Sequence, residues 1–315
     1  MNRSSTARRR WLLPIALLSA LTLVVVACSK DDDKASNNTT TKGDTSAMVK
    51  AAFVYIGPIN DGGWTQAHEE GRTEAAANLK GKAELTYKES IPEGPEAKQA
   101  MEDLIKDGNT IIFANSFGYG DAMKELAAKY PDVKFEHATG AGTLPNYATY
   151  YGASEDTIYL SGLAAGAAIP DGGTVGFVAP FPIPEVIRHI NAFQVGVAEA
   201  NPAATTKVVW TGTWFDPEVE RKAADSLIAG GAAAIASGQD SPAPGEAAKT
   251  AKLPFVGYDS DQSKNLGDSW LTAAIYHWGD YYTGRIQAVI DGNWKTGEYY
   301  GGIKDGFTSL APFGP

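Results

Sequence analysis

The chain has one cysteine, Cys28, among its 315 residues. A single thiol makes neither an internal disulfide nor a thiolate metal site, so the folded part depends on its hydrophobic core alone. Basic residues are also scarce, since 27 Lys and Arg stand against 37 Asp and Glu and give a formal net charge of -10. Nucleic-acid binding requires clustered Lys and Arg, so we expect no nucleic-acid partner. The acidic balance itself indicates solubility and no particular partner.

Motifs of catalysis and cofactor binding are missing as well. The four histidines, His68, His137, His189 and His277, lack the spacing of metal ligands. There is no Gly-x-Ser-x-Gly nucleophile elbow and no phosphate loop ending in Gly-Lys-Ser/Thr, and the one Gly-Gly turn near the first strand lacks the full dinucleotide fingerprint. We therefore predict no metal, no cofactor and no enzymatic activity. His137 closes a predicted strand, and we expect it to be partly buried with its hydrogen bonds satisfied.

An apolar run at residues 11–27 follows three arginines. The run has about 17 residues, short for a hydrocarbon core that needs roughly 20. It contains Pro14 and ends in small residues, as processed signals do. Its end, Val-Val-Ala-Cys, resembles a bacterial lipobox, in which the cysteine thiol receives a diacylglyceryl group and becomes the mature N-terminus. We predict a lipoprotein signal peptide at 1–27 and lipidation of Cys28, the alternative being a membrane span.

A polar segment, residues 28–48, separates the lipidated cysteine from the first apolar strand. It has no aromatic residue and too little apolar surface to form a core. About 20 such residues behave as a flexible tether with a mean reach near 25 Å. Two acyl chains on Cys28 would give stable anchoring. We therefore expect a protein of the cell envelope, lipid-anchored on the outer side of the cytoplasmic membrane, at the cell surface or in a periplasm.

From residue 49 onward, short apolar runs alternate with longer amphipathic stretches. The predicted strands are 50–56, 83–88, 110–114, 133–137, 147–151, 174–178, 207–211, 232–236, 255–258 and 271–275. The predicted helices are 65–79, 95–107, 121–129, 157–168, 185–200, 217–229 and 280–290. This alternation predicts α/β architecture with parallel sheets covered on both faces. Because the pattern runs twice, we expect two doubly wound domains rather than one large sheet.

Ligands of such sheets bind beyond the carboxyl ends of the strands, so the residues after each strand are the candidate site. The first strand is followed by Gly-Pro-Ile-Asn-Asp-Gly-Gly-Trp, residues 57–64. Its paired glycines allow a tight turn and the close approach of another backbone. Asp61 is placed to cap the next helix. We expect Trp64 to present its ring to the cleft, the alternative being a core tryptophan.

Further aromatic and hydroxyl side chains follow two other strands. Ser116 and Phe117 come after the third strand, where they would supply a hydroxyl and a stacking wall, although Ser is also a common turn residue. Trp214 follows the seventh strand and would be a second stacking surface. Asp216 precedes Pro217, which predicts a helix N-cap rather than a ligand contact.

Carboxylates follow the eighth and ninth strands. Asp240 and Asp259 at these positions would accept N–H donors from a heterocycle or hydroxyls from a sugar diol, the alternative being helix capping. Trp278 follows the tenth strand and would add aromatic surface. The pattern favours a binding cleft without chemistry.

Seven segments, taken in order, are similar to one known family. They read AFVYIGPINDGGW, EGRTEAAANL, FANSFGYGDAM, YPDVKFEHATG, GFVAPFPIPEVIRHINAF, NPAATTKVVWTGTWFDPEVERKAADSLI and VGYDSDQ. From about residue 50 to the C-terminus, the sequence resembles the basic membrane protein (Bmp) family of substrate-binding components of ABC importers. The resemblance implies an α/β type I periplasmic-binding-protein fold, in which two doubly wound Rossmann-like domains are joined by a three-crossover hinge.

The resemblance also implies a domain organisation, with crossings between the lobes near Gly152, Asp259 and Trp294. The expected parts are the signal peptide 1–27, the lipidated Cys and tether 28–48, an N-terminal lobe of 49–152 plus 260–293, and a C-terminal lobe of 153–259 plus 294–315.

Members of this family include purine nucleoside receptors and nucleobase binders, in which a purine stacks between aromatic rings and an Asp meets its ring nitrogens. Nucleoside receptors carry a Lys near the ribose, whereas His277 and Trp278 stand in that region here. A small flat ligand such as adenine or hypoxanthine is therefore favoured over a nucleoside. The ligand-binding residues expected from strand ends and resemblance together are Asn60, Asp61, Trp64, Ser116, Phe117, Trp214, Asp240, Asp259 and Trp278.

The sequence thus predicts a lipid-anchored receptor that binds a purine base or nucleoside and feeds an ABC permease. One alternative keeps the fold and changes the ligand to a sugar or another small heterocycle, because fold alone does not choose a ligand. Another is a surface antigen or signalling lipoprotein. An exported hydrolase is disfavoured, since nothing supplies a nucleophile and base.

Overall fold

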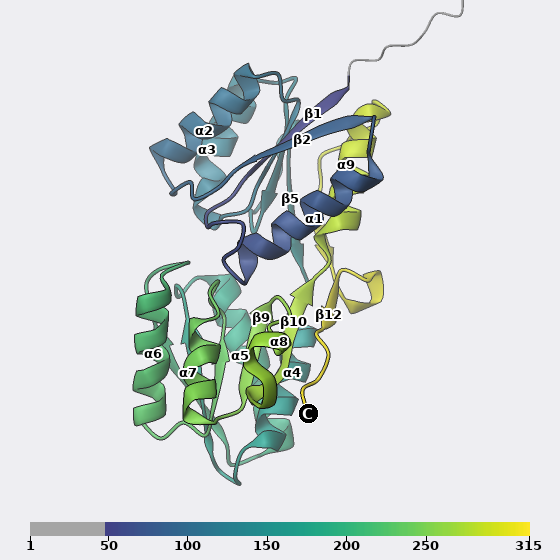
Figure 1. Cartoon of the computed structure of the whole chain (residues 1–315). Helices are drawn as coiled ribbons and strands as arrows, with labels where there is room; N and C mark the ends of the chain where they lie inside the picture. Colours follow the sequence, from purple (N-terminus) through teal and green to yellow (C-terminus); the bar gives the residue numbers. More distant parts are fainter. Residues whose placement is uncertain (1–47) are drawn as a thin grey trace, which may run out of the picture. The chain divides into compact units, whose positions relative to one another are not determined.

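The computed structural model describes residues 48–315 (Figure 1). The predicted signal peptide, Cys28 and all of the predicted tether except its last residue lie outside the described residues. Within residues 48–315, no helix combines the length and apolar character that a membrane crossing requires.

A first six-stranded sheet has the order β11-β5-β4-β3-β1-β2, and all neighbouring strands are parallel. Its strands are β1 (Val49–Val54), β2 (Ala83–Lys88), β3 (Ile111–Ala114), β4 (Lys134–Ala138), β5 (Tyr147–Gly152) and β11 (Glu298–Gly301). The central strands β1 and β3 carry apolar side chains on both faces because both faces are covered by helices.

The helices of the first sheet are α1 (Trp64–Asn78), α2 (Pro95–Lys106), α3 (Gly120–Lys129) and α9 (Trp278–Ile290). Helices α2 and α3 cover one face, and α1 and α9 cover the other (Figure 1). A short 3-10 turn, Phe117–Tyr119, joins β3 to α3. We call this sheet with its four helices the first lobe.

A second six-stranded sheet has the order β12-β10-β9-β8-β6-β7. Its strands are β6 (Thr174–Ala179), β7 (Thr205–Trp210), β8 (Ala234–Ser237), β9 (Phe255–Asp259), β10 (Trp270–Tyr276) and β12 (Thr308–Leu310). All neighbours are parallel except β12, which is antiparallel to β10 at the sheet edge.

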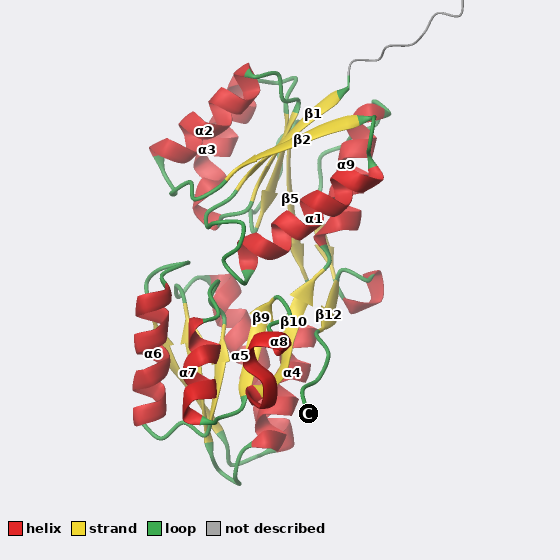
Figure 2. Cartoon of the chain, viewed as in Figure 1, coloured by secondary structure: helices red, strands yellow, loops and turns green. Residues whose placement is uncertain are grey.

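The second sheet is also covered on both faces (Figure 2). Its helices are α4 (Glu155–Ala168), α5 (Pro184–Ala200), α6 (Pro217–Ala229), α7 (Ala243–Ala251) and the short α8 (Ser263–Leu266). Helices α4 and α5 pack on one face and α6 and α7 on the other. Helices α4 and α5 approach closely, because a Cβ at Gly196 would lie 2.0 Å from the carbonyl oxygen of Tyr159. We call this sheet with its helices the second lobe.

The α/β fold of two doubly wound lobes is confirmed. Each predicted strand and helix is present, with ends shifted by at most two residues. The sequence did not predict β11, β12, α7 or α8.

The predicted lobe boundaries were wrong at the second and third crossings. Strand β10 pairs with β9 in the second lobe, although residues 260–293 had been assigned to the first. Strand β11 pairs with β5 in the first lobe, although residues 294–315 had been assigned to the second. The crossings therefore follow β5, β10 and β11. An apolar strand carries no local signal for the sheet it joins, since that choice depends on tertiary pairing.

Candidate ligand-binding site

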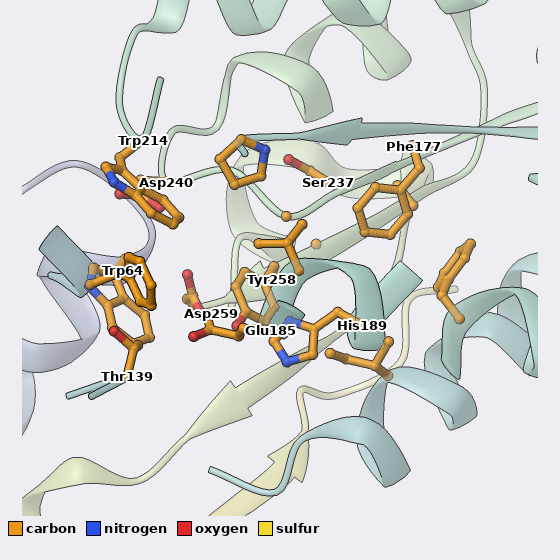
Figure 3. A pocket seen from close by; sticks show the side chains of 18 of the residues that line it. Trp64, Thr139, Phe177, Glu185, His189, Trp214, Ser237, Asp240, Tyr258 and Asp259 are labelled. Carbon is orange, nitrogen blue, oxygen red and sulfur yellow. The ribbon is translucent and has the colours of Figure 1, made fainter. Parts of the chain in front are cut away.

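A cavity between the two lobes lies at the carboxyl ends of the parallel strands (Figure 3). Its empty space, including the open solvent at its mouth, is about 710 Å³. The first lobe contributes Ile56, Trp64, Asn115, Ser116, Phe117 and Thr139. The second lobe contributes Ile158, Ser161, Phe177, Pro180, Glu185, Val186, His189, Phe193, Trp214, Ala236, Ser237, Gly238, Asp240, Val256, Gly257, Tyr258 and Asp259.

Two tryptophans from different lobes lie at the same end of the cavity (Figure 3). The Trp64 Nε1 donates to the carbonyl oxygen of Asn115 at 2.7 Å, which fixes the indole at the start of α1. The Trp214 ring packs against Phe181 with centroids 5.0 Å apart. The Trp214 Nε1 is buried without a hydrogen-bond partner among the described residues. Phe117 is 47% exposed and adds a third ring near the mouth.

Three carboxyl groups, of Glu185, Asp240 and Asp259, also line the cavity (Figure 3). Both carboxylate oxygens of Asp259, and Oδ2 of Asp240, are buried without a partner in residues 48–315. Native proteins pair most buried polar atoms, so these oxygens are placed to accept hydrogen bonds from a ligand. No Lys or Arg is among the residues that line the cavity.

Burial and repulsion by nearby carboxylates raise the pKa of each of these carboxyls. Burial is the largest cause for Asp240 and Asp259, whose pKa values lie well above the ordinary range, and neighbouring carboxylates, Asp61 foremost, raise both further. Burial also raises the pKa of Glu185 to about 7. A ligand that donates N–H groups to these side chains would favour their ionised forms.

Two lining residues have a strained backbone. Thr139, after β4, has φ of 63°, and Asp259, at the end of β9, has φ of 67°. The left-handed region is uncommon for residues other than glycine and is an outlier for a β-branched side chain. The Thr139 Oγ1 is also buried without a partner in the described part of the chain. Strained residues concentrate at binding sites, which supports a functional role for both.

The Gly62-Gly63 turn of the first lobe contacts the second lobe beside the cavity. The Gln262 Nε2 donates to the carbonyl oxygen of Gly62 at 2.9 Å, and the Ser260 hydroxyl donates to the same oxygen. A Cβ at Gly63 would lie 2.4 Å from the carbonyl oxygen of Asp240. Only glycine permits this approach, so the lobes meet here in a closed arrangement.

Six of the predicted site residues line the cavity. They are Trp64, Ser116, Phe117, Trp214, Asp240 and Asp259. The Ser116 hydroxyl already donates to Oε1 of Glu93 at 2.6 Å, so it has no free proton to donate to a ligand.

Asn60 and Asp61 are not among the lining residues. Asn60 is exposed. The Asp61 carboxylate accepts from the backbone N–H groups of Gly63, Thr65 and Gln66 at 2.8–2.9 Å. Asp61 therefore shapes the turn and caps α1, and its charge reaches the cavity only through space.

Trp278 lies in the aromatic core of the first lobe rather than at the cavity. It is 1% exposed, and its ring stacks on His68 with centroids 4.2 Å apart and on Tyr276 at 4.9 Å. The chain re-enters the first lobe just before Trp278, which turns this side chain into the core.

The predicted set lacked several lining residues with polar side chains, which are Asn115, Thr139, Ser161, Glu185, His189, Ser237 and Tyr258. The Asn115 Oδ1 accepts from the Ile56 backbone N–H at 3.0 Å, and its Nδ2 is unpartnered among the described residues. Asn115 and Thr139 also follow strands, so the strand-end rule could have found them. Glu185 lies in the first turn of α5. Acidic residues are common in the first turn of a helix, where they interact favourably with its dipole, so no local motif marks Glu185 as a ligand contact.

The described residues contain no group of three or more His, Cys, Asp or Glu suited to holding a metal ion. His137 is buried, and its Nε2 donates to the Ser116 carbonyl oxygen at 2.7 Å while Tyr147 Oη lies 2.7 Å from Nδ1. The predicted structural role of His137 is confirmed.

Comparison with known proteins finds one matching family and several similar proteins. The sequence model of the Bmp family, described as "ABC transporter substrate-binding protein PnrA-like", matches residues 48–311. A purine-binding protein of Brucella abortus (strain 2308) is 39% identical over 265 residues, which span 84% of this chain and 75% of that protein. A putative ABC transporter glucose-binding protein of Haloferax volcanii is 38% identical over 267 residues, spanning 85% of this chain and 68% of that protein.

Among solved structures, a solute-binding protein of an ABC transporter system from Aeropyrum pernix K1 superposes with a TM-score of 0.75 at 18% identity. The match covers 84% of this chain and 76% of that chain. At this identity the likeness shows a shared fold.

Proposed function

The chain belongs to the Bmp family of PnrA-like ABC transporter substrate-binding proteins, and from this premise we propose that it captures a purine for an ABC permease. The ligand is a purine base or nucleoside, with an adenine- or hypoxanthine-like base favoured. The family consists of solute-binding proteins and not of enzymes. The proposal includes a lipid anchor at Cys28 that holds the receptor on the outer side of the cytoplasmic membrane.

The observation that carries the purine proposal is the pairing of flat aromatic walls with unpartnered carboxylate oxygens in one cavity. Trp64 and Trp214 offer π surfaces from opposite lobes. Asp240 and Asp259 offer acceptors for the N–H groups at the edge of a purine. A relative that shares 39% of its residues with this chain is described as purine-binding.

The energies of these contacts are sufficient for a scavenging receptor. Stacking contributes about 1–3 kcal/mol for each base face, and a hydrogen bond to a charged group contributes about 1.5–3 kcal/mol. After the entropy of association, a net of roughly -8 to -11 kcal/mol gives micromolar to low-nanomolar dissociation constants.

Charge narrows the ligand class further. A nucleotide would bring a phosphate to three carboxyl groups, with no Lys or Arg among the lining residues to hold it. Burying an unpaired anion is costly. We therefore expect bases and nucleosides to bind and nucleotides to be rejected.

Closure of the lobes around the ligand supplies the signal for delivery. The Gly62-Gly63 turn reaches Gln262 and Asp240 only when the lobes are together. A ligand that touches both lobes favours this closed arrangement by its differential affinity. The permease then receives a receptor whose surface differs from that of the empty form.

Isothermal titration of the full chain tests the proposal, with adenine, hypoxanthine, adenosine, AMP and glucose as ligands. At least one base should bind with micromolar or lower Kd, and AMP should not bind. If glucose binds and no purine does, the ligand is a sugar rather than a purine, as the description of the relative from Haloferax volcanii suggests.

Trp214→Ala should weaken binding at least tenfold, whereas Trp210→Ala, at an exposed position outside the cavity lining, should leave it unchanged.

A further inference from the structure

The cavity extends past the tryptophans into the core of the second lobe. Its inner end is lined by Ile158, Phe177, Val186, Phe193, Ala236 and Val256. All six belong to the hydrophobic cluster between the second sheet and helices α4 and α5, and none is more than 5% exposed. In Figure 3, Phe177 and His189 lie on the opposite side of the cavity from Trp64 and Trp214.

The polar groups at this inner end are already engaged. The Ser161 hydroxyl donates to the Ile158 carbonyl oxygen at 2.8 Å. The His189 Nε2 pairs with the Ser154 hydroxyl at 3.0 Å. Burial lowers the pKa of His189 to about 4, so its ring is neutral at physiological pH. The outer end differs, because its carboxylate oxygens and the Trp214 Nε1 are unpartnered among the described residues.

Small side chains create the space at the inner end. Ala236 of β8 belongs to the cluster between the second sheet and helices α4 and α5, and Ser161 of α4 also lines the cavity. Protein cores are packed without voids of appreciable size, and an empty volume in a core is destabilising. A cavity that continues from a ligand site into a core is therefore better explained by a ligand group that fills it.

We propose that the inner end is a second subsite, which takes an apolar alkyl or aryl substituent carried by the heterocycle bound at the outer end. This inference rests on the proposed purine function and deepens it. The preferred ligand is then a substituted purine, and a bare base fills only the outer end. A ribose does not suit the inner end, because its hydroxyls would be buried without free partners.

Titration of the full chain with adenine, N6-benzyladenine and 9-benzyladenine tests the subsite. The two benzyl compounds carry the ring on opposite edges of the base, so one of them should reach the inner end. Each buried methylene is expected to improve Kd about fourfold, and we expect that compound to bind at least tenfold more tightly than adenine. If neither benzyl compound binds more tightly than adenine, the subsite proposal is overturned.

Ala236→Leu would fill the inner end and should abolish the tenfold gain of the benzyl compound over adenine, with both ligands titrated against the same variant. Ala203→Leu, at an exposed loop position, is the matched control and should keep the gain. A gain that survives Ala236→Leu would place the substituent elsewhere and overturn the proposal.

Xenon supplies a measurement that depends on neither purine binding nor the folding of the variant. Apolar cavities remain dry and bind xenon, so crystals of the unchanged chain under xenon pressure should show it at the inner end of the cavity, beside the lining residues Phe177 and Phe193. A failure of every purine to bind, with xenon present there, would refute the proposed function and leave an apolar cavity. Absence of xenon from the inner end would refute the subsite itself.

Discussion

At the scale of single residues, the site is defined by buried carboxyls that lack a cation. Asp240, Asp259 and Glu185 of the second lobe line the same cavity, and no Lys or Arg is among the lining residues. The buried, unpartnered carboxylate oxygens of Asp240 and Asp259 destabilise the fold, so we expect a ligand to provide the missing hydrogen bonds. Two measurable consequences follow, one for stability and one for affinity.

The first consequence is a dependence of stability on the charge of Glu185. Its folded pKa of about 7 lies above the ordinary 4.5. The folded protein therefore keeps a proton that the unfolded chain releases, and this contribution to stability is lost as pH rises from about 4.5 to 7. Urea unfolding should show that the free energy of unfolding of Glu185→Gln, relative to that of the unchanged chain, rises by about 1–3 kcal/mol between pH 5 and pH 8. A difference that does not change with pH would contradict this account.

The second consequence is that the buried Asp259 carboxyl lowers the stability of the fold and raises the affinity for the ligand. Asn keeps the shape and tolerates the positive φ of this position, but it replaces one of the two acceptor oxygens of the carboxylate with an NH2 donor. Asp259→Asn should weaken adenine binding about 10- to 100-fold, while the free energy of unfolding stays equal or rises. Asp261→Asn, at an exposed residue whose carboxylate accepts from the Ser263 backbone N–H, should change neither quantity. Loss of stability in Asp259→Asn with unchanged affinity would make Asp259 a structural residue.

The sequence predicted much of this site because parallel strands bring their carboxyl ends to one edge. Trp214 and Asp259 were found by that rule. Trp278 also follows a strand but lies in the core of the first lobe, because the chain crosses to that lobe just before it. Asp216 was correctly predicted as an N-cap, since its Oδ1 accepts from the backbone N–H groups of Glu218 and Val219 at 3.1 Å. Glu185 belongs to a helix start and had no such rule.

At the scale of elements, the turn between β1 and α1 controls contact between the lobes. Gly62 has φ of 88°, and a Cβ there would lie 2.9 Å from Cδ of Pro242 in the second lobe. Gly81 has φ of 80°, and a Cβ there would meet nothing within 4 Å. The two glycines thus carry similar backbone strain, and only one of them faces the other lobe.

Substituting these two glycines separates the effect of lobe closure on ligand affinity from the effect of backbone strain on stability. Gly62→Ala and Gly81→Ala should each lower the free energy of unfolding by about 1 kcal/mol. Only Gly62→Ala should weaken adenine binding, at least tenfold, because the new methyl group opposes the closed arrangement. Titration and urea unfolding of both variants provide the measurement. Equal affinities in the two variants would show that the turn does not limit closure.

Element prediction succeeded where periodicity was long and failed where elements were short or broken. Strand β11 is an edge strand of four residues, mostly exposed, and β12 has three residues. Helix α7 begins with Ala-Pro-Gly, which is typical of a turn. The sheet joined by β10 was misassigned because both sheets accept an equally apolar strand.

At the scale of the whole molecule, the account requires a receptor held at a membrane. The residues that would anchor it lie outside the described range, so the lipobox remains a prediction. Only a cysteine thiol forms the thioether to diacylglycerol. In cells fed labelled palmitate, the unchanged chain and Ser29→Ala should become labelled, and Cys28→Ser should not. Labelling of Cys28→Ser would contradict the lipoprotein prediction without affecting the fold or the site.

The central claim is that the two lobes close on a flat heterocycle, with tryptophan faces on its sides and a carboxylate at its edge. A crystal structure of the adenine complex tests it most directly. The account predicts adenine between Trp64 and Trp214, with an N–H group donating to the Asp259 carboxylate and the Gly62-Gly63 turn against the second lobe. Adenine bound away from both tryptophans, or held without Asp259, would contradict it.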